Sequence, residues 1–321
     1  MSAPARLAAF VAVAAAVFGI ALLGGRTVGP VAEAEPAHDT HAGDTDEAGD
    51  ADGSHAAHDA EPAEPAEAAD IPGGLLSSQD GYTLTLAEER AAAGRAVPIA
   101  FTITGPDGSP VTSYDVQHEK ELHLIAVRRD LTGFQHVHPT LAGDGTWSTD
   151  LALTPGTWRL YADFRATGAE PLTLGTDLAV EGDFRPAAPT GERRTAVIGD
   201  YRVTLEGDLT AGADARLTLS VSRGGRPVTD LQPYLGAFGH LVALRSGDLA
   251  YLHVHPDGEP GDGRTEPGPD VVFHAAVPSD GTYHLYLDFR HDGVVRTAAF
   301  TVTAGGVEQE EKHGESSGHA H

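Results

Sequence analysis

An internal repeat constrains the fold of this chain more than any other feature of its sequence. The segment that begins at Val111, VTSYDVQHEKELHLIAVRRDLTGFQHVHP, is matched by one that begins at Val228, VTDLQPYLGAFGHLVALRSGDLAYLHVHP. The two align at a constant offset of 117 residues up to the HVHP that ends each of them. Farther along, GTWRLYADFR at Gly156 corresponds to GTYHLYLDFR at Gly281. Because a repeated unit fixes the architecture, we expect two homologous domains.

The extent of the repeat sets the domain boundaries. The first copy spans 81–182, the second spans 199–304, and a linker containing Pro and Arg at 183–198 joins them. The second copy is longer because it contains a stretch rich in Gly, Pro and Asp, Asp257–Asp270, that has no counterpart in the first. We expect this stretch to form a loop.

Each copy reads as short apolar segments separated by turn residues. In the first copy these segments are YTLTL, PIAFTIT, LHLIAVR, FQHVHP, TWSTDLAL, TWRLYADF and LTLGTDLAV. About seven strands in about 100 residues are typical of an immunoglobulin-like sandwich. The sequence therefore predicts an all-β protein with two tandem immunoglobulin-like β-sandwich domains. Trp147 and Trp158 are expected to belong to the core of the first.

The N-terminus is apolar and has a positive charge before it. Arg6 precedes an uninterrupted apolar stretch from Leu7 to Leu23, and the small-residue pattern Ala-Glu-Ala ends at Ala34. Residues 1–34 are expected to be a secretory signal peptide cleaved after Ala34, or a hydrophobic helix that stays as an N-terminal membrane anchor. In the second case the N-terminus would lie in the cytoplasm. Both alternatives make the protein extracytoplasmic, either secreted or anchored to the membrane.

Two further segments have the composition of disordered chain. Residues 35–72 are rich in Ala, Asp, Glu, Pro, Gly and His and contain no Lys or Arg, and residues 305–321 are similarly polar. Such segments have too little apolar surface to form a core. They carry seven histidines that either hold divalent metals loosely or belong to a solvated spacer: His38, His41, His55, His58, His313, His319 and His321.

The composition excludes several kinds of partner and site. The net charge of −26 argues against nucleic acid, because a phosphate backbone requires clustered Lys and Arg. The chain has no Cys and no Met other than Met1, which excludes thiolate sites and the usual thioether site for Cu(I). It has 17 His. A metal bound by this chain must therefore be held by imidazole and carboxylate groups.

The candidate metal ligands are three histidines that occur in both copies. The first copy has His123 with the His-Val-His motif of His136 and His138, and the second has His240 with His253 and His255. Residues i and i+2 of a strand point to the same face, about 6.6 Å apart. The two rings of each motif can therefore converge on one ion at bond lengths of about 2 Å.

A hairpin would bring the third histidine of each copy to the same place. In the second copy, a two-residue loop at Gly247-Asp248 is a recognised hairpin signal, and it pairs residues whose numbers sum to 495. That register places His240 opposite His255. The corresponding sum in the first copy, 261, places His123 opposite His138. Because a slip of one residue would turn the rings to opposite faces, this prediction is specific.

A structural role for the same histidines is the alternative. They share a face with apolar residues such as Ile125, Val127 and Phe134, so they could be packed in a core and hydrogen-bonded to main-chain carbonyls. A metal site would need acceptors that orient the rings, and Asp163 and Asp288 in the matched LYADFR and LYLDFR segments are candidates. Glu121 could add a carboxylate ligand to the first copy.

The string HEKELHLIAV, followed by FQHVHP, resembles the extracytoplasmic β-sandwich domains of bacterial copper- and heavy-metal-handling proteins of the CopC-like and YtkA-like kind. The resemblance covers both repeats and rests on the strand pattern and the histidine motif. It implies an immunoglobulin-like sandwich that binds or passes copper outside the cytoplasm. It also implies that the six repeated histidines, His123, His136, His138, His240, His253 and His255, are the ligands. Without further methionines, Cu(II) is favoured and Zn(II) is the second choice.

These observations predict an extracytoplasmic divalent-metal buffer or chaperone, with metal ions as partners, membrane contact through the N-terminal segment and a protein partner still to be found. Two sites per chain are expected, with binding that weakens as the pH falls through about 6.5. The rival hypothesis is a membrane-tethered, non-catalytic interaction or structural module with packed histidines. A water-activating enzyme is a third possibility. We expect no enzyme, because no serine elbow, paired catalytic carboxylates or nucleotide-binding loop occurs.

Overall fold

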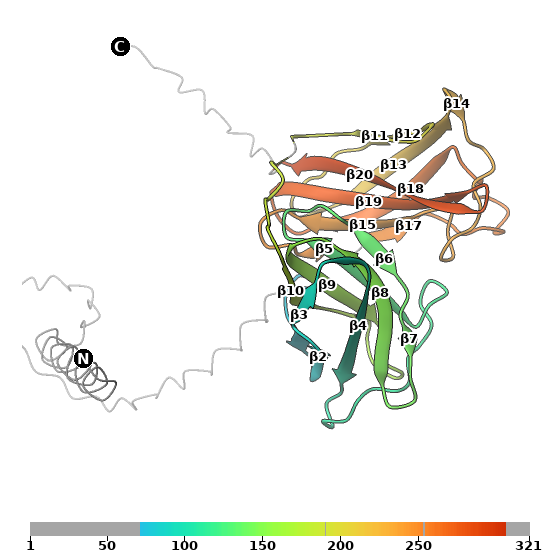
Figure 1. The fold of residues 1–321 in the computed structure, drawn as a ribbon. Helices are drawn as coiled ribbons and strands as arrows, with labels where there is room; N and C mark the ends of the chain where they lie inside the picture. The colour runs from blue at the N-terminus through green and yellow to red at the C-terminus, as the bar shows by residue number, and fades with distance from the viewer. Residues whose placement is uncertain (1–70, 190, 253, 306–321) are drawn as a thin grey trace, which may run out of the picture. The chain divides into compact units, whose positions relative to one another are not determined.

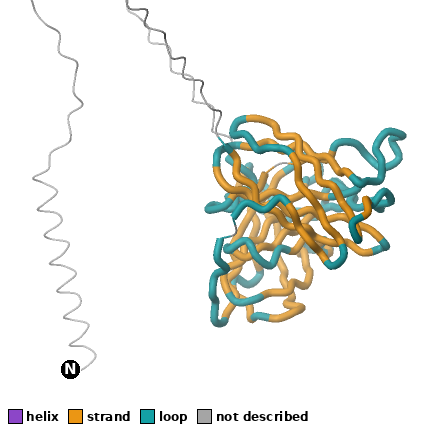
Figure 2. The backbone as a smooth tube through the Cα atoms, turned by 90° about the horizontal axis from the view of Figure 1, so that it is seen from above, coloured by secondary structure: helices purple, strands orange, loops and turns teal. Residues whose placement is uncertain are grey.

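The computed structural model describes residues 71–189, 191–252 and 254–305. These residues form strands and loops, and no helix occurs among them (Figure 2). The all-β prediction is therefore confirmed. No helix of this part of the chain is long and apolar enough to cross a membrane. The expected signal peptide or anchor, and nearly all of the two expected disordered segments, lie outside the described residues.

The first repeat consists of two five-stranded sheets, coloured blue to green in Figure 1. One sheet has the order β1-β2-β4-β8-β7, with bounds Ser78–Gln79, Tyr82–Leu86, Gly94–Thr104, Thr146–Leu153 and Thr140–Leu141. The other has the order β3-β10-β9-β5-β6, with bounds Arg90–Ala92, Leu172–Glu181, Gly156–Phe164, Leu122–Arg128 and Gln135–Val137.

The second repeat also consists of two sheets, coloured yellow to red. The larger has the order β11-β12-β13-β18-β17 with β14 paired to β13, and its bounds are Thr195–Ile198, Tyr201–Glu206, Ala213–Arg223, Asp270–Val277, Val254–Pro256 and Arg226–Pro227. The smaller has the order β16-β15-β19-β20, with bounds Tyr251–Leu252, His240–Arg245, Gly281–His291 and Val294–Ala304. The Asp-, Gly- and Pro-rich stretch of this repeat connects β17 to β18 largely as a loop, as expected.

Each repeat is a β-sandwich, because its two sheets enclose an apolar core of their own. Along β8 and β12, buried positions alternate with more exposed ones, which is the pattern of a strand with one face in the core. Trp147 and Trp158 are buried in the core of the first repeat, which confirms their predicted place. Tyr283 and Phe289 lie in the core of the second.

A third apolar cluster joins the two repeats. It contains Ile125 and Val127 of β5 together with Val242 and Leu244 of β15. Strand β5 is buried on both faces, because Leu124 and its alternate neighbours pack inside the first sandwich. The face of β5 that carries His123 is therefore directed toward the second repeat rather than into the core of its own sandwich.

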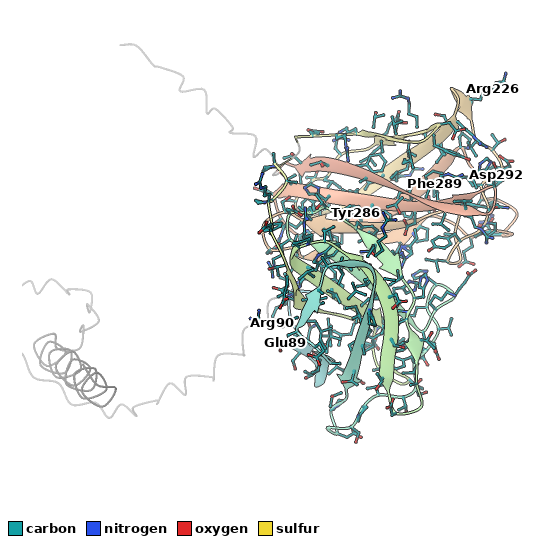
Figure 3. All side chains as sticks on the ribbon, viewed as in Figure 1. Glu89, Arg90, Arg226, Tyr286, Phe289 and Asp292 are labelled. Atoms are coloured by element: carbon teal, nitrogen blue, oxygen red, sulfur yellow. The ribbon has the colours of Figure 1, made fainter. Side chains whose placement is uncertain are left out.

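Two tyrosines fix this contact reciprocally. The hydroxyl of Tyr161 on β9 donates to the carbonyl of Leu249 in the second repeat at 2.6 Å. The hydroxyl of Tyr286 on β19, labelled in Figure 3, donates to the carbonyl of Leu131 in the first repeat at 2.8 Å. The Tyr286 ring also stacks on Phe134, with centroids 4.0 Å apart. The equivalent strands β9 and β19 thus each carry a tyrosine that contacts the hairpin of the other repeat.

The predicted hairpin registers are correct next to the turns and wrong farther out in the second copy. In the first repeat Ile125 pairs with His136, and in the second Ala243 pairs with Leu252, as the sums 261 and 495 require. Beyond Leu252, however, the chain crosses to the other sheet, as strands at sandwich corners can. There β17 pairs with β18, so that His255 lies opposite His274, and the predicted ladder pair of His240 with His255 is not formed.

Candidate metal centre

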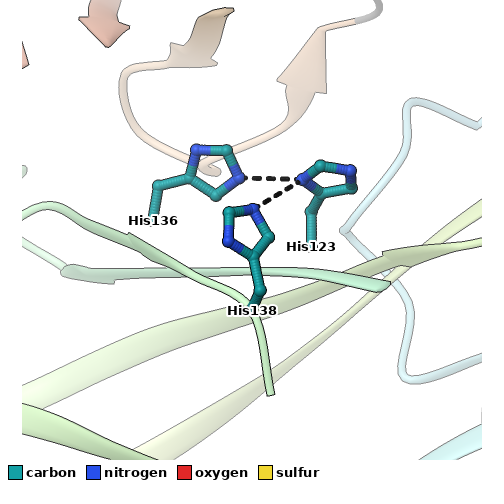
Figure 4. Close-up of side chains that lie close together, drawn as sticks. All are labelled: His123, His136 and His138. Carbon is teal, nitrogen blue, oxygen red and sulfur yellow. Dashed lines mark hydrogen bonds between the residues drawn. The ribbon is translucent and has the colours of Figure 1, made fainter. Parts of the chain in front are cut away.

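Three histidines of the first repeat converge on one point. His123 comes from β5, His136 from β6, and His138 from the residues just after β6. Nδ1 of His123 lies 3.0 Å from Nε2 of His136 and 3.2 Å from Nε2 of His138 (Figure 4). One ring nitrogen from each residue falls within 4.8 Å of the other two. The structure therefore brings together all three predicted ligands of the first copy.

The spacing of these nitrogens fits a common ion. Two imidazole nitrogens bound to one tetrahedral ion at about 2.0–2.1 Å lie about 3.3 Å from each other, close to the two shortest distances here. The three rings are also evenly spaced, with centroids 5.2, 5.0 and 4.9 Å apart. The donor set fits Cu(II) or Zn(II), because both accept neutral imidazole.

Hydrogen bonds on the outer side of two rings determine which nitrogens carry protons. Nε2 of His123 lies 3.0 Å from the carbonyl oxygen of Gln117, and Nδ1 of His136 lies 2.9 Å from Oδ2 of Asp288. Carbonyl and carboxylate oxygens only accept, so these outer nitrogens must donate. A neutral imidazole has a single proton, which leaves lone pairs on Nδ1 of His123 and Nε2 of His136. With both imidazoles neutral, these two lone pairs face each other at 3.0 Å, and Nε2 of His138, 3.2 Å from Nδ1 of His123, is the ring nitrogen beside them.

Two of the three histidines have pKa values well below neutral pH. Burial lowers the pKa of His123 to about 3, against an opposing effect of the Gln117 carbonyl, and the neighbouring His136 and His138 lower it further. Burial also lowers the pKa of His138 to about 4, together with the charges of His136 and Lys120. His123 and His138 are therefore neutral imidazoles near pH 7, which is the ligand form that a metal ion binds.

Asp288 and Asp163 occupy equivalent positions but have different contacts. Asp288 lies opposite His240 in the β15–β19 ladder, and Asp163 lies opposite His123 in the β5–β9 ladder. Asp288 accepts from His136 and from the hydroxyl of Thr297. Asp163 accepts from the hydroxyl of Thr173 at 3.0 Å, and burial raises its pKa to about 6. The expected orienting carboxylate is therefore present, but it comes from the opposite repeat.

The second predicted triad is not assembled like the first. His253 lies outside the described residues, and His255 is exposed on β17. After Leu252 the chain changes sheet, which separates the HVHP motif from β15. The alignment of the two repeats could not reveal this change. Instead, the ring of His240 lies 4.7 Å from that of His136 and 5.4 Å from that of His123, centroid to centroid.

A cavity of about 250 Å³ adjoins the cluster and brings a further histidine close to it. Its lining includes His118, His123, Asp163, His240 and His255. His118 has no histidine counterpart in the second copy, yet its ring lies 6.1 Å from His123 and 5.8 Å from His240 between centroids. The contact between the repeats accounts for the proximity of His118 to His240.

Glu121, the possible carboxylate ligand, is exposed and does not belong to the three-residue group. Although it lies two residues before His123, it precedes the first residue of β5. The alternation argument that placed both residues on one face therefore does not extend to it.

The fold and the site define a tandem β-sandwich protein with a partly buried histidine cluster at the contact between its repeats. Two stretches of the chain, residues 77–181 and 195–306, match the model of a family described as a domain of unknown function (DUF8832). The chain belongs to this family, and each repeat contains one match. No curated protein matches the sequence.

Several solved structures are loosely similar to the chain. The Escherichia coli adhesin FdeC is 17% identical, with 72% of this chain and 65% of that chain covered and a TM-score of 0.24. The Yersinia pseudotuberculosis adhesin InvE is 13% identical, with 71% and 60% covered and a TM-score of 0.20. A Salmonella alpha-2-macroglobulin is 14% identical, with 73% and 15% covered and a TM-score of 0.23. The chain spans less than two thirds of each, and scores this low carry no argument about function.

Proposed function

We propose that this protein binds a divalent transition-metal ion through His123, His136 and His138 and serves as an extracytoplasmic metal buffer or chaperone. The observation that carries the proposal is the convergence of one ring nitrogen from each of these histidines within 4.8 Å, with Nδ1 of His123 3.0 Å from Nε2 of His136. The tautomers of this pair are fixed from outside by the Gln117 carbonyl and the Asp288 carboxylate. A metal ion would satisfy all three converging nitrogens at once.

Copper is the first candidate for the ion and zinc the second. Neutral imidazoles bind both, and the Irving–Williams order places Cu(II) above Zn(II) at an equivalent site. The resemblance to CopC-like and YtkA-like domains also favours copper. The ion is cargo in this proposal rather than a catalytic cofactor, and we propose no enzymatic activity.

The proposal involves one tightly bound ion per chain instead of the two that the repeated sequence predicted. His240 lies beside the cluster of the first repeat. Of the other two histidines of the second motif, His255 is exposed and His253 lies outside the described residues. The location outside the cytoplasm, with or without a membrane anchor, also remains a proposal. It rests on the apolar N-terminal segment.

Calorimetry on the full chain tests this proposal, with the seven histidines of the two terminal segments replaced by Ala so that only the folded region contributes. We expect one Cu(II) per chain at high affinity. His136→Ala should abolish this binding, whereas His274→Ala should leave it unchanged, because His274 is exposed on β18 outside the cluster. Equal binding by both variants would contradict the proposal.

The structural hypothesis keeps one specific observation in its favour. His136 and Asp288 form a buried contact between the two repeats that could stabilise the protein without any metal. If this contact has a purely structural role, His136→Ala lowers the free energy of unfolding, and neither the variant nor the unsubstituted protein binds metal. The calorimetric experiment thus separates the two functions.

A further inference from the structure

The Nδ1 atom of His240 is buried and has no hydrogen-bond partner. Most buried polar groups are hydrogen-bonded, since a buried group left without a partner costs about 1–3 kcal/mol. His240 begins β15, and it lies at the contact between the repeats, beside the three-histidine cluster.

We propose that His240 is a fourth ligand of the same ion, so that one metal bridges the two repeats. This inference rests on the proposed function, and it adds that the site is complete only when both repeats contribute to it. The first repeat supplies His123, His136 and His138, and the second supplies His240 and the Asp288 that orients His136.

Ring spacing supports a shared ion. Two imidazoles bound to one tetrahedral ion have centroids about 5 Å apart, given bond lengths of about 2.0–2.1 Å. The His240 ring lies 4.7 Å from His136 and 5.4 Å from His123, which brackets that value. The three rings of the cluster are 4.9 to 5.2 Å apart. His240 is therefore spaced from two of the cluster rings much as those rings are spaced from each other.

The topology of the second repeat also supports this arrangement. His240 and Asp288 form a cross-strand pair on β15 and β19, and Asp288 already contacts His136. The same ladder that orients one ligand therefore carries the unpartnered imidazole. The shared apolar cluster of Ile125, Val127, Val242 and Leu244 holds β5 and β15 against each other, so the repeats keep His240 beside the site. Its ring nitrogens lie outside the group of three within 4.8 Å, and a rotation of the His240 side chain would bring Nδ1 to the ion.

Electron paramagnetic resonance of Cu(II) bound to the full chain, again without the terminal histidines, tests the inference. Each coordinated imidazole nitrogen contributes hyperfine splitting to the signal. For His240→Ala we expect one bound Cu(II) per chain, a spectrum with one nitrogen fewer, and an affinity reduced by at least the 10-fold that follows loss of an outer contact to a ligand.

Two further variants make the outcome unambiguous. His240→Asn retains a polar atom near the position of Nδ1 and should recover part of the affinity, whereas His274→Ala should match the unsubstituted protein. A spectrum and a Kd that do not change in folded His240→Ala and His240→Asn would overturn the role of His240 while leaving the three-histidine site intact. Failure of the unsubstituted protein to bind Cu(II) would instead contradict the proposed function itself.

Discussion

Nδ1 of His136 lies 2.9 Å from Oδ2 of Asp288, a residue 152 positions later in the chain. The two side chains are only 1% and 5% exposed. This contact joins the first repeat to the second and directs Nε2 of His136 toward His123 and the rest of the cluster. It thus connects the arrangement of the two domains with the chemistry proposed for the site.

Replacement of this carboxylate should weaken metal binding without abolishing it. In Asp288→Asn the group that fixes the His136 tautomer is lost, and we expect the affinity for Cu(II) to fall by about 10–100-fold with one ion still bound. Asp163→Asn is the matched control, because Asp163 occupies the equivalent position and accepts from Thr173. Equal losses in the two variants, measured by competition with a chelator of known affinity, would argue against the orienting role of Asp288.

Metal binding should persist to a lower pH than an ordinary histidine site allows. The sequence alone suggested competition from protons near pH 6.5, but burial lowers the pKa of His123 to about 3 and that of His138 to about 4. Protons therefore compete with the metal for these two imidazoles only when the pH approaches these values. Equilibrium dialysis between pH 7 and pH 4.5 should retain the ion. Release centred near pH 6.5 would contradict this prediction.

The metal-free protein should lose stability as the pH falls. The pKa values of His123 and His138 are lower in the folded state than the ordinary value near 6.5, so the unfolded chain binds more protons below that pH. Their contribution to the free energy of unfolding is complete above about pH 6.5 and is lost progressively toward pH 4 and 3.

Asp163 opposes this trend, because its raised pKa of about 6 makes the folded state bind more protons between its ordinary value and pH 6. Urea unfolding at pH 7 and pH 5 measures the balance. His138→Gln should reduce the loss of stability between these two pH values, and Asp163→Asn should increase it. The opposite signs would show that other groups control the acid response.

The two tyrosine hydroxyls should couple the unfolding of the repeats. Tyr161→Phe and Tyr286→Phe each leave a main-chain carbonyl without its partner, that of Leu249 or Leu131, and each should cost about 1–2 kcal/mol. The double variant should unfold in two transitions in urea. Tyr283→Phe, which removes a bond to Ser279 within one repeat, should keep a single transition. Two transitions in that control as well would show that the hydroxyls are not the coupling element.

Local features of the fold could be predicted from the sequence with useful accuracy. The predicted segment LHLIAVR coincides with β5 and TWSTDLAL coincides with β8, because their alternation and flanking turn residues are strong local signals. The pairing of Ala243 with Leu252 followed from the turn signal at Gly247-Asp248, and the corresponding register in the first copy pairs Ile125 with His136. These features depend on neighbouring residues, and the sequence contains them directly.

The contact between the repeats could not be predicted in the same way. An apolar face such as that of Ile125 and Val127 has the same pattern whether it packs inside one sandwich or against another domain. The change of sheet after Leu252 separates His255 from β15 and is not apparent from an alignment that runs through it without a gap. The roles of Asp288 and His240 depend on both features, so the sequence suggested two equal sites where the structure brings one cluster together.

X-ray absorption at the copper edge identifies the atoms that bind the ion in the proposed site. The sample is the full chain with the seven terminal histidines replaced and one equivalent of Cu(II) added. The account predicts three or four nitrogen ligands at about 2.0 Å with the outer-shell scattering of imidazole rings. A spectrum dominated by oxygen ligands, without imidazole scattering, would contradict it.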